Sequence, residues 1–121
     1  MILTIDPPAA LINANQRLHH HAKAKLTRAW RQAAHDAVGF DPYHYTRAHL
    51  TVYIRFANNI RRDVGNYYPT AKAIVDGLVD ALVLADDNDQ HVIGPDMRRD
   101  YPNGPLRVRV RIDPLDDKEA A

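Results

Sequence analysis

Four aspartates in the middle of the chain are the residues best suited to bind a metal ion together. Asp86, Asp87 and Asp89 fall within four positions, and the segment that separates them from Asp63 is short enough to fold back as a helix. Crowded carboxylates repel one another, and Mg²⁺ is bound in proteins by one or two carboxylates together with water and phosphate oxygens. Such a site can position water for attack on a phosphodiester. The alternative is a solvated acidic loop with an unrelated Asp63, which the clustering by itself favours.

Two other kinds of metal site are excluded by the sequence. The spacing of Asp87 and Asp89 also occurs in EF-hand loops, but the glycine and the glutamate that such a loop needs at its positions 6 and 12 are missing. The chain has no cysteine, so it forms neither thiolate metal sites nor disulfides.

The pattern of apolar residues predicts the elements that position these side chains. Apolar residues at alternate or consecutive positions predict strands over 3–5, 50–56, 91–93 (continuing irregularly toward 101) and 106–112. Apolar residues at helical spacing predict helices over 22–38 and from 69 to about 82. Their order predicts an α+β (mixed α/β) fold, with a small mixed sheet of about four strands and two helices on one face.

Individual positions within these elements support the same arrangement. Trp30 lies in the middle of the apolar stripe of the first helix and is expected in the core, and Leu82 closes the buried stripe of the second. Pro69 suits the first turn of a helix. Pro102-Asn103-Gly104-Pro105 predicts a turn before the last strand. We expect one domain over 1–113 and a charged, flexible tail over 114–121.

Composition and charge limit the classes of function. A length of 121 residues with 45% hydrophobic residues suits one globular domain. No window resembles a membrane span and the first residues do not resemble a secretory signal, so we expect a cytoplasmic protein without membrane partners. Residues 1–62 carry nine Lys or Arg against three Asp, whereas residues 63–121 carry seven against twelve acids. This division suits a nuclease, which needs cations for phosphates and carboxylates for a metal, although halves of a sequence can mix in space.

The order and spacing of several motifs resemble the RusA family of Holliday junction resolvases. The resemblance covers almost the whole chain, and its most specific part lies between Arg62 and Val92. It is carried by Arg61-Arg62-Asp63-Val64-Gly65-Asn66, Pro69-Thr70-x-Lys72, Asp76-Gly77-Leu78 and Leu84-Ala85-Asp86-Asp87-Asn88-Asp89-x-His91-Val92. The segments Pro7-Pro8, Asn13-x-Asn15-x-Arg17-Leu18 and Ala29-Trp30-Arg31 are similar to the opening strand, polar loop and first helix of that family.

The resemblance implies an activity and a set of catalytic residues. Members of the family are homodimers from bacteria, phages or prophages that use Mg²⁺, for which Mn²⁺ is expected to substitute, and need no organic cofactor. They cut two opposed strands of a four-way DNA junction during recombination or repair. The matching catalytic positions are Asp63, Lys72 and Asp87, and the candidate metal ligands are Asp63, Asp87, Asp86, Asn66 and Asp89.

One position departs from the family pattern. The commoner motif is Asp-x-Asp-Asn, and the chain has Gly65 where the second aspartate would stand. Asn66 could supply a neutral ligand instead, or Asp76 or Asp89 could take the place of the missing carboxylate. Because this carboxylate is missing, one alternative is a protein that binds junctions without cutting them. A nuclease for flaps or replication forks is a further alternative.

Basic, amide and aromatic residues are candidates for DNA contacts. The predicted set is Asn13, Asn15, Arg17, His20, Lys23, Lys25, Arg28, Arg31, Arg62 and Tyr67. Tyr67 or Tyr68 could stack on an unpaired base or could pack in the core or a dimer interface. His19-His20-His21 could contact phosphates or form a solvated loop. A metal site is not expected there, because adjacent histidines do not share a helix face.

Two further basic features are each open to two interpretations. Lys72 lies four residues before Asp76, a spacing typical of an exposed ion pair of about 0.3–0.5 kcal/mol, or it could act on the scissile phosphate. Arg107, Arg109 and Arg111 share one side of the last strand, where they could form a phosphate track or a solvated sheet edge.

Overall fold

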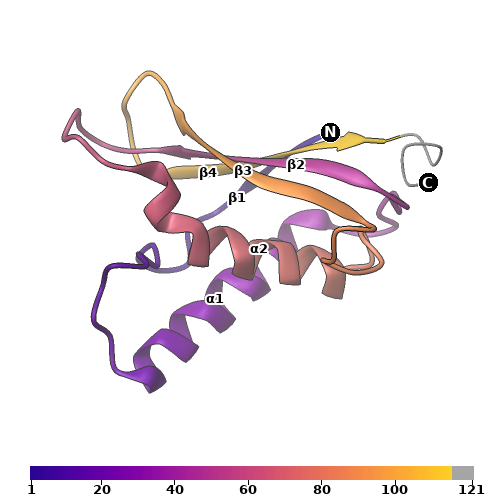
Figure 1. The fold of residues 1–121 in the computed structure, drawn as a ribbon, viewed down its shortest axis with the longest axis horizontal. Coiled ribbons are helices and arrows are strands. Elements are labelled where there is room, and N and C mark those ends of the chain that lie inside the picture. The colour runs from indigo at the N-terminus through magenta and orange to yellow at the C-terminus, as the bar shows by residue number, and fades with distance from the viewer. Residues whose placement is uncertain (116–121) are drawn as a thin grey trace.

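The computed structural model describes residues 1–115 and shows a four-stranded mixed sheet with two helices on one face (Figure 1). The elements in chain order are β1 (Ile2–Ile5), α1 (His20–Val38), β2 (Ala48–Arg55), the 3-10 helix η1 (Val64–Tyr67), α2 (Tyr68–Asp80), β3 (Val92–Asp100) and β4 (Arg107–Pro114). The strand order is β1-β4-β2-β3, in which β2 and β3 run parallel and the other pairs antiparallel. The predicted α+β fold is confirmed.

The core forms between the sheet and the helices. Leu50, Val52 and Ile54 of β2 are fully buried. They lie opposite fully buried residues of β4, with Val52 beside Val110. Because alternate residues of a strand point to opposite faces, this apolar set faces the helices and leaves a polar set on the other face, which we call the open face. Burial of each such side chain contributes about 1.5–3 kcal/mol.

Helix α1 is fixed against this core by Trp30. The indole ring is fully buried, as predicted, and its Nε1 donates a hydrogen bond to the carbonyl oxygen of Ala10 at 2.9 Å. A buried Trp needs a partner for its N–H, and this bond also ties the segment after β1 to the helix.

Helices α1 and α2 approach most closely at Gly77. A Cβ atom added at Gly77 would lie 2.8 Å from the Cβ of Ala34 and would also collide with the carbonyl oxygen of Arg31. Both contacts belong to the middle of α1, which cannot move aside without disturbing the core. Position 77 therefore requires glycine for packing, which gives a physical reason for the Asp76-Gly77-Leu78 motif.

Several element boundaries differ from the prediction. Helix α2 ends at Asp80, and Leu82, which was placed in the buried stripe, is instead 69% exposed with a φ of 65°. The amide of Val83 donates to the carbonyl oxygen of Leu78 at 3.0 Å, so the chain turns out of the helix there and buries Val83 instead of Leu82. The prediction failed because the apolar spacing continues past the point where the backbone leaves the helix.

The last strand also differs from the prediction in two respects. β4 lies between β1 and β2, so the interpretation of its arginines as a sheet edge is wrong. It continues to Pro114, and the amide of Leu115 donates to the carbonyl oxygen of Arg47 at 2.9 Å, so the predicted tail is wrong for its first two residues. The remaining part of the predicted tail, 116–121, lies outside the described residues. Within 1–115, no helix is long and apolar enough to cross a membrane.

The contact at Gly77 predicts a marked loss of stability on substitution. We expect Gly77→Ala to lower the free energy of unfolding by about 1–3 kcal/mol, because the added methyl group overpacks the α1–α2 contact. Urea unfolding measures this. Gly104→Ala is the control, since its Cβ would meet the side chain of Arg55 at 3.2 Å, and that flexible side chain can move. Equal losses in the two variants would contradict the packing argument.

Candidate functional site

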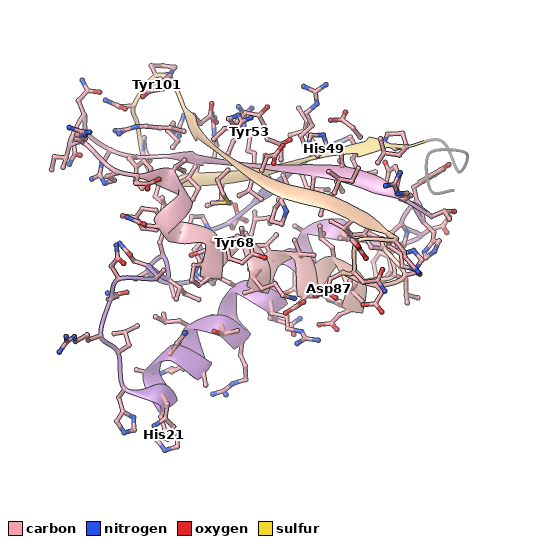
Figure 2. The ribbon with its side chains drawn as sticks, in the orientation of Figure 1. His21, His49, Tyr53, Tyr68, Asp87 and Tyr101 are labelled. Atoms are coloured by element: carbon pink, nitrogen blue, oxygen red, sulfur yellow. The ribbon has the colours of Figure 1, made fainter. Side chains whose placement is uncertain are left out.

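Lys72 of α2 is the centre of the predicted catalytic residues. Its Nζ donates to Asp76 Oδ1 at 2.6 Å and to Asp87 Oδ2. The pair with Asp76 follows from the spacing of four residues on one helix. The pair with Asp87 requires the loop after α2 to fold back along the helix, and Figure 2 shows Asp87 beside α2 on the helical side of the sheet. Two of the three predicted catalytic residues are therefore in contact.

Hydrogen bonds within the loop fix its backbone around Asp87. Asp86 Oδ1 accepts from the amide of Asp87 at 2.7 Å, and the amide of Val92 donates to the carbonyl oxygen of Asn88 at 2.9 Å. Asp86, Asp87 and Asp89 are all exposed. The loop thus presents its carboxylates to solvent just before the chain enters β3.

Asp63 occupies the other end of the motif, at the start of η1. Its Oδ1 accepts from the amide of Gly65 at 3.0 Å, and its carbonyl oxygen accepts from the amide of Asn66 at 3.1 Å. Asp63 is the N-cap of η1, where a carboxylate satisfies free amide groups. Its side chain is exposed, so the cap leaves it accessible.

The candidate metal ligands have suitable chemistry but do not form a tight cluster. Carboxylate and amide oxygens from Asp63, Asn66, Asp86, Asp87 and Asp89 are the ligand type that Mg²⁺ prefers. Among residues 1–115, however, three or more Asp, Glu or His ligand atoms lie within 4.8 Å of one another only in the histidine group described below. Lys72 supplies the positive charge next to Asp87.

The charges at Lys72 and Asp87 stabilise each other. The hydrogen bond from Lys72 lowers the pKa of Asp87, with a smaller contribution from Asp86, and burial opposes it. Burial by itself lowers the pKa of Lys72, but the hydrogen bonds to Asp76 and Asp87 outweigh it, so the pKa is raised. Lys72 is therefore a cation and Asp87 a carboxylate at neutral pH. A protonated Lys72 can stabilise negative charge on a phosphate.

The predicted DNA-binding residues form two groups. Asn13, Asn15, Arg62 and Tyr67 line one cavity, together with Gln16 and Phe56, which the sequence analysis missed. The second group lies in the exposed chain before α1 and along that helix, and it consists of Arg17, His20, Lys23, Lys25, Arg28 and Arg31.

Arg31 differs from the rest of the second group because it already has a partner. Its Nε and Nη2 donate to the two carboxylate oxygens of Asp80 at 2.5 and 2.8 Å. This bidentate pair links α1 to the end of α2. Arg31 is thus the least available of the predicted phosphate contacts.

The three histidines lie closer together than expected. The ring centroids of His19, His20 and His21 are 4.1–5.0 Å apart. His19 precedes the helix and its Nδ1 accepts from the amide of His21 at 3.2 Å, so the three rings gather at the start of α1. The argument that adjacent histidines do not share a helix face does not apply to all three, because only His20 and His21 belong to the helix.

The arginines of β4 lie on the open face and are partly neutralised. Arg107 and Arg109 both donate to Asp100 Oδ2 of β3, at 3.2 and 2.8 Å, while Arg111 pairs with Asp113. Figure 2 shows His49 and Tyr53 on this same face, away from the helices. Asp100 was missed because the irregular strand over 91–101 gave no clear alternation. Its place at alternate positions with Asp96 and Arg98 was the available signal.

A scan against protein-family models finds no family that matches the chain, and a search of curated proteins finds no match either. The resemblance to the RusA family therefore rests on the sequence motifs alone.

The buried Asp100 and the two half-buried arginines that pair with it predict a pH-dependent stability. Burial raises the pKa of Asp100, but the hydrogen bonds from Arg107 and Arg109 outweigh it, so the pKa lies below its ordinary value of 3.8. A depressed pKa contributes stability that is present above the unfolded value and is lost as pH falls through the folded one.

We therefore expect Asp100→Asn to be less stable than the wild type by about 1–3 kcal/mol at neutral pH. The difference should shrink as pH falls below 3.8. Urea unfolding at a series of pH values measures it. Asp113→Asn is the control. It removes the partner of Arg111, which is more exposed than Asp100, and it should change the free energy of unfolding little. A difference that does not change with pH would contradict the assignment.

Proposed function

We propose that the protein is a Mg²⁺-dependent, structure-selective endonuclease that cleaves four-way and related branched DNA, as the RusA resemblance implies. The observation that carries this proposal is the contact between Lys72 and Asp87. These residues come from a helix and from the loop that follows it, and no local rule of helix geometry brings them together. They are two of the positions that match the catalytic residues of that family.

The chemistry assigned to each residue follows from its charge and exposure. Asp87 would hold the cation together with Asp63, Asp86 and Asn66, all of which offer oxygen ligands. When bound, Mg²⁺ supplies an activated water and neutralises charge on the phosphate. Lys72 stays protonated and stabilises the negative charge that develops on the phosphate oxygens. The products would carry a 5′-phosphate and a 3′-hydroxyl.

The proposal includes a homodimer in the bacterial or phage-infected cytoplasm. Cutting two opposed strands requires two active sites, and each chain carries one acidic stretch. A two-fold axis would then relate the two sites. The exposed cations before and along α1, such as Arg17, Lys23 and Arg28, are available to hold the arms by their phosphates.

The Asp87 assignment predicts a separation of binding from cleavage. We expect Asp87→Asn to abolish incision of a synthetic four-way junction in Mg²⁺ or Mn²⁺ while leaving junction binding in EDTA near the wild-type level. Gel assays of nicking and of binding measure the two properties. Asp36→Asn, an exposed acid of α1, is the control that should retain both. Full cleavage by Asp87→Asn would contradict the proposal.

The second candidate is a protein that binds junctions without cutting them, and Gly65 favours it. The chain lacks the carboxylate that the commoner family motif has at this position, and the described acids form no tight group of three. Incubation of the wild type with Mg²⁺ and a panel of four-way junctions, flaps and forks distinguishes the candidates. Binding without nicks on any substrate would favour the second one.

The geometry at Gly65 predicts that a carboxylate there would strengthen cation binding. A Cβ added at this position would lie 3.2 Å from Asp63 Oδ1, so the side chain would emerge directly beside that carboxylate. In Gly65→Asp the two like charges repel, which should lower the melting temperature in EDTA. Added Mn²⁺ should then raise it by more than in the wild type.

Thermal unfolding with and without Mn²⁺ tests this prediction. Gly65→Asn is the matched control, because it has a similar volume and no charge. It should show neither the loss in EDTA nor the enlarged gain with Mn²⁺. The same response in both variants would show that position 65 does not belong to a cation site.

A further inference from the structure

A cavity of about 480 Å³ is lined by Arg62 and Tyr67, which flank Asp63 and the 3-10 helix that it caps. It is bounded by the segment between β1 and α1 and by the chain that leads from β2 into η1. Its volume falls within the range of about 300–1,000 Å³ that is typical of small-ligand sites. Amide side chains line it, namely Asn13, Asn15 and Gln16, together with Arg62 and the aromatic residues Phe56 and Tyr67.

Hydrogen bonds fix the amide-bearing wall of the cavity. The amide of Ile12 donates to Thr70 Oγ1 at 2.7 Å, and that hydroxyl donates back to the carbonyl oxygen of Ile12 at 3.0 Å. Thr70 is fully buried in α2. The amide of Ala14 donates to the carbonyl oxygen of Asn66 at 2.7 Å. The wall is therefore attached both to η1 and to α2, and its shape does not depend on a ligand.

The opposite wall presents flat, polarisable groups. The guanidinium of Arg62 lies 4.4 Å from the centre of the Phe56 ring and donates from Nη2 to Asn58 Oδ1 at 2.8 Å. The rings of Phe56 and Tyr67 are 5.4 Å apart and tilted by 51°. Phe56 is buried, so Arg62 and the half-buried Tyr67 offer the accessible flat surfaces. Among the described residues that line the cavity, Arg62 is the charged one and no carboxylate takes part.

We propose that this cavity binds an unpaired nucleobase of the DNA substrate, next to the strand that is cut. Asn and Gln amides can donate to and accept from the edge of a base. Asn13 Oδ1 already accepts from the amide of Asn15 at 2.8 Å, which fixes that side chain and leaves its amino group to donate. A planar base can stack on a guanidinium and on a tyrosine ring, and single-strand binding proteins recognise bases in this way.

The position of the cavity links base binding to cleavage. Arg62 immediately precedes Asp63, and Tyr67 is the last residue of the 3-10 helix that Asp63 caps. A nucleotide with its base in the cavity would therefore have its phosphate near Asp63. Selectivity for branched DNA follows, because bases at a branch point can leave the stack at lower cost than paired ones. This link rests on the proposed function, whereas binding of the base itself does not need catalysis.

The test uses the full chain in EDTA and a DNA duplex that contains one unpaired fluorescent adenine analogue. We expect the wild type to change the fluorescence of this probe and to bind a fully paired duplex more weakly. Asn15→Ala and Tyr67→Ala should each weaken probe binding roughly tenfold. Tyr67→Phe, which keeps the ring, should bind like the wild type. Gln32→Ala, an amide change on the exposed side of α1, is the control for amide loss elsewhere.

Each outcome decides between the two proposals. Probe binding that depends on Asn15 and Tyr67, without nicking of any branched substrate in Mg²⁺, supports the base site and overturns the nuclease proposal. Nicking in Mg²⁺ with probe binding unchanged in both variants overturns the base site. A wild type that binds paired and unpaired probes equally also overturns it. Circular dichroism shows whether Tyr67→Ala is folded. If Tyr67→Ala is not folded, Asn15→Ala carries the test, because it changes an exposed side chain.

Discussion

The close approach of α2 to α1 at Gly77 is the constraint on which the rest of the molecule depends. It allows both helices to lie against one face of the sheet and to cover the apolar rows of β2 and β4. Helix α2 carries Lys72, follows the 3-10 helix that Asp63 caps, and precedes the loop of Asp87. A shift of α2 would therefore move every proposed catalytic residue at once. Packing within the core thus sets the geometry of a site whose carboxylates Asp63, Asp86 and Asp87 lie at the surface.

The segment between β1 and α1 depends on the same helix. It has no helix or strand of its own, yet Thr70 and Asn66 each bind its backbone, and Trp30 binds the carbonyl oxygen of Ala10. Backbone groups that leave regular structure need other partners, and here the partners come from α1, η1 and α2. The amides of Asn13 and Asn15 are held beside Arg62 as a result, which makes a cavity out of residues distant in the sequence.

The positive charges of the chain are divided between internal pairs and free surface. Arg107 and Arg109 compensate Asp100 on the open face, and Arg31 compensates Asp80 between the helices. These arginines contribute to the fold, and their attraction for phosphate is reduced by the carboxylates they already bind. Lys23 and Arg28, which lie exposed on α1, retain theirs. Counting Lys and Arg along the sequence could not separate these groups, because most of the pairs join different elements.

The sequence by itself determined the fold class, most of both helices and the buried position of Trp30, because these follow from local periodicity. It also singled out Lys72 and Asp87 as candidate catalytic residues, since the motif spacing is a property of the chain. Only the tertiary structure decided the exit of α2 before Leu82, the interior place of β4, and the meeting of Gln16 and Phe56 in one cavity. Long-range packing decides which side chains meet, and it depends on contacts that no local pattern encodes. The contact of Lys72 with Asp87 depends on both sequence and tertiary structure. The motif pointed to the two residues, and the folding back of the loop brought them together.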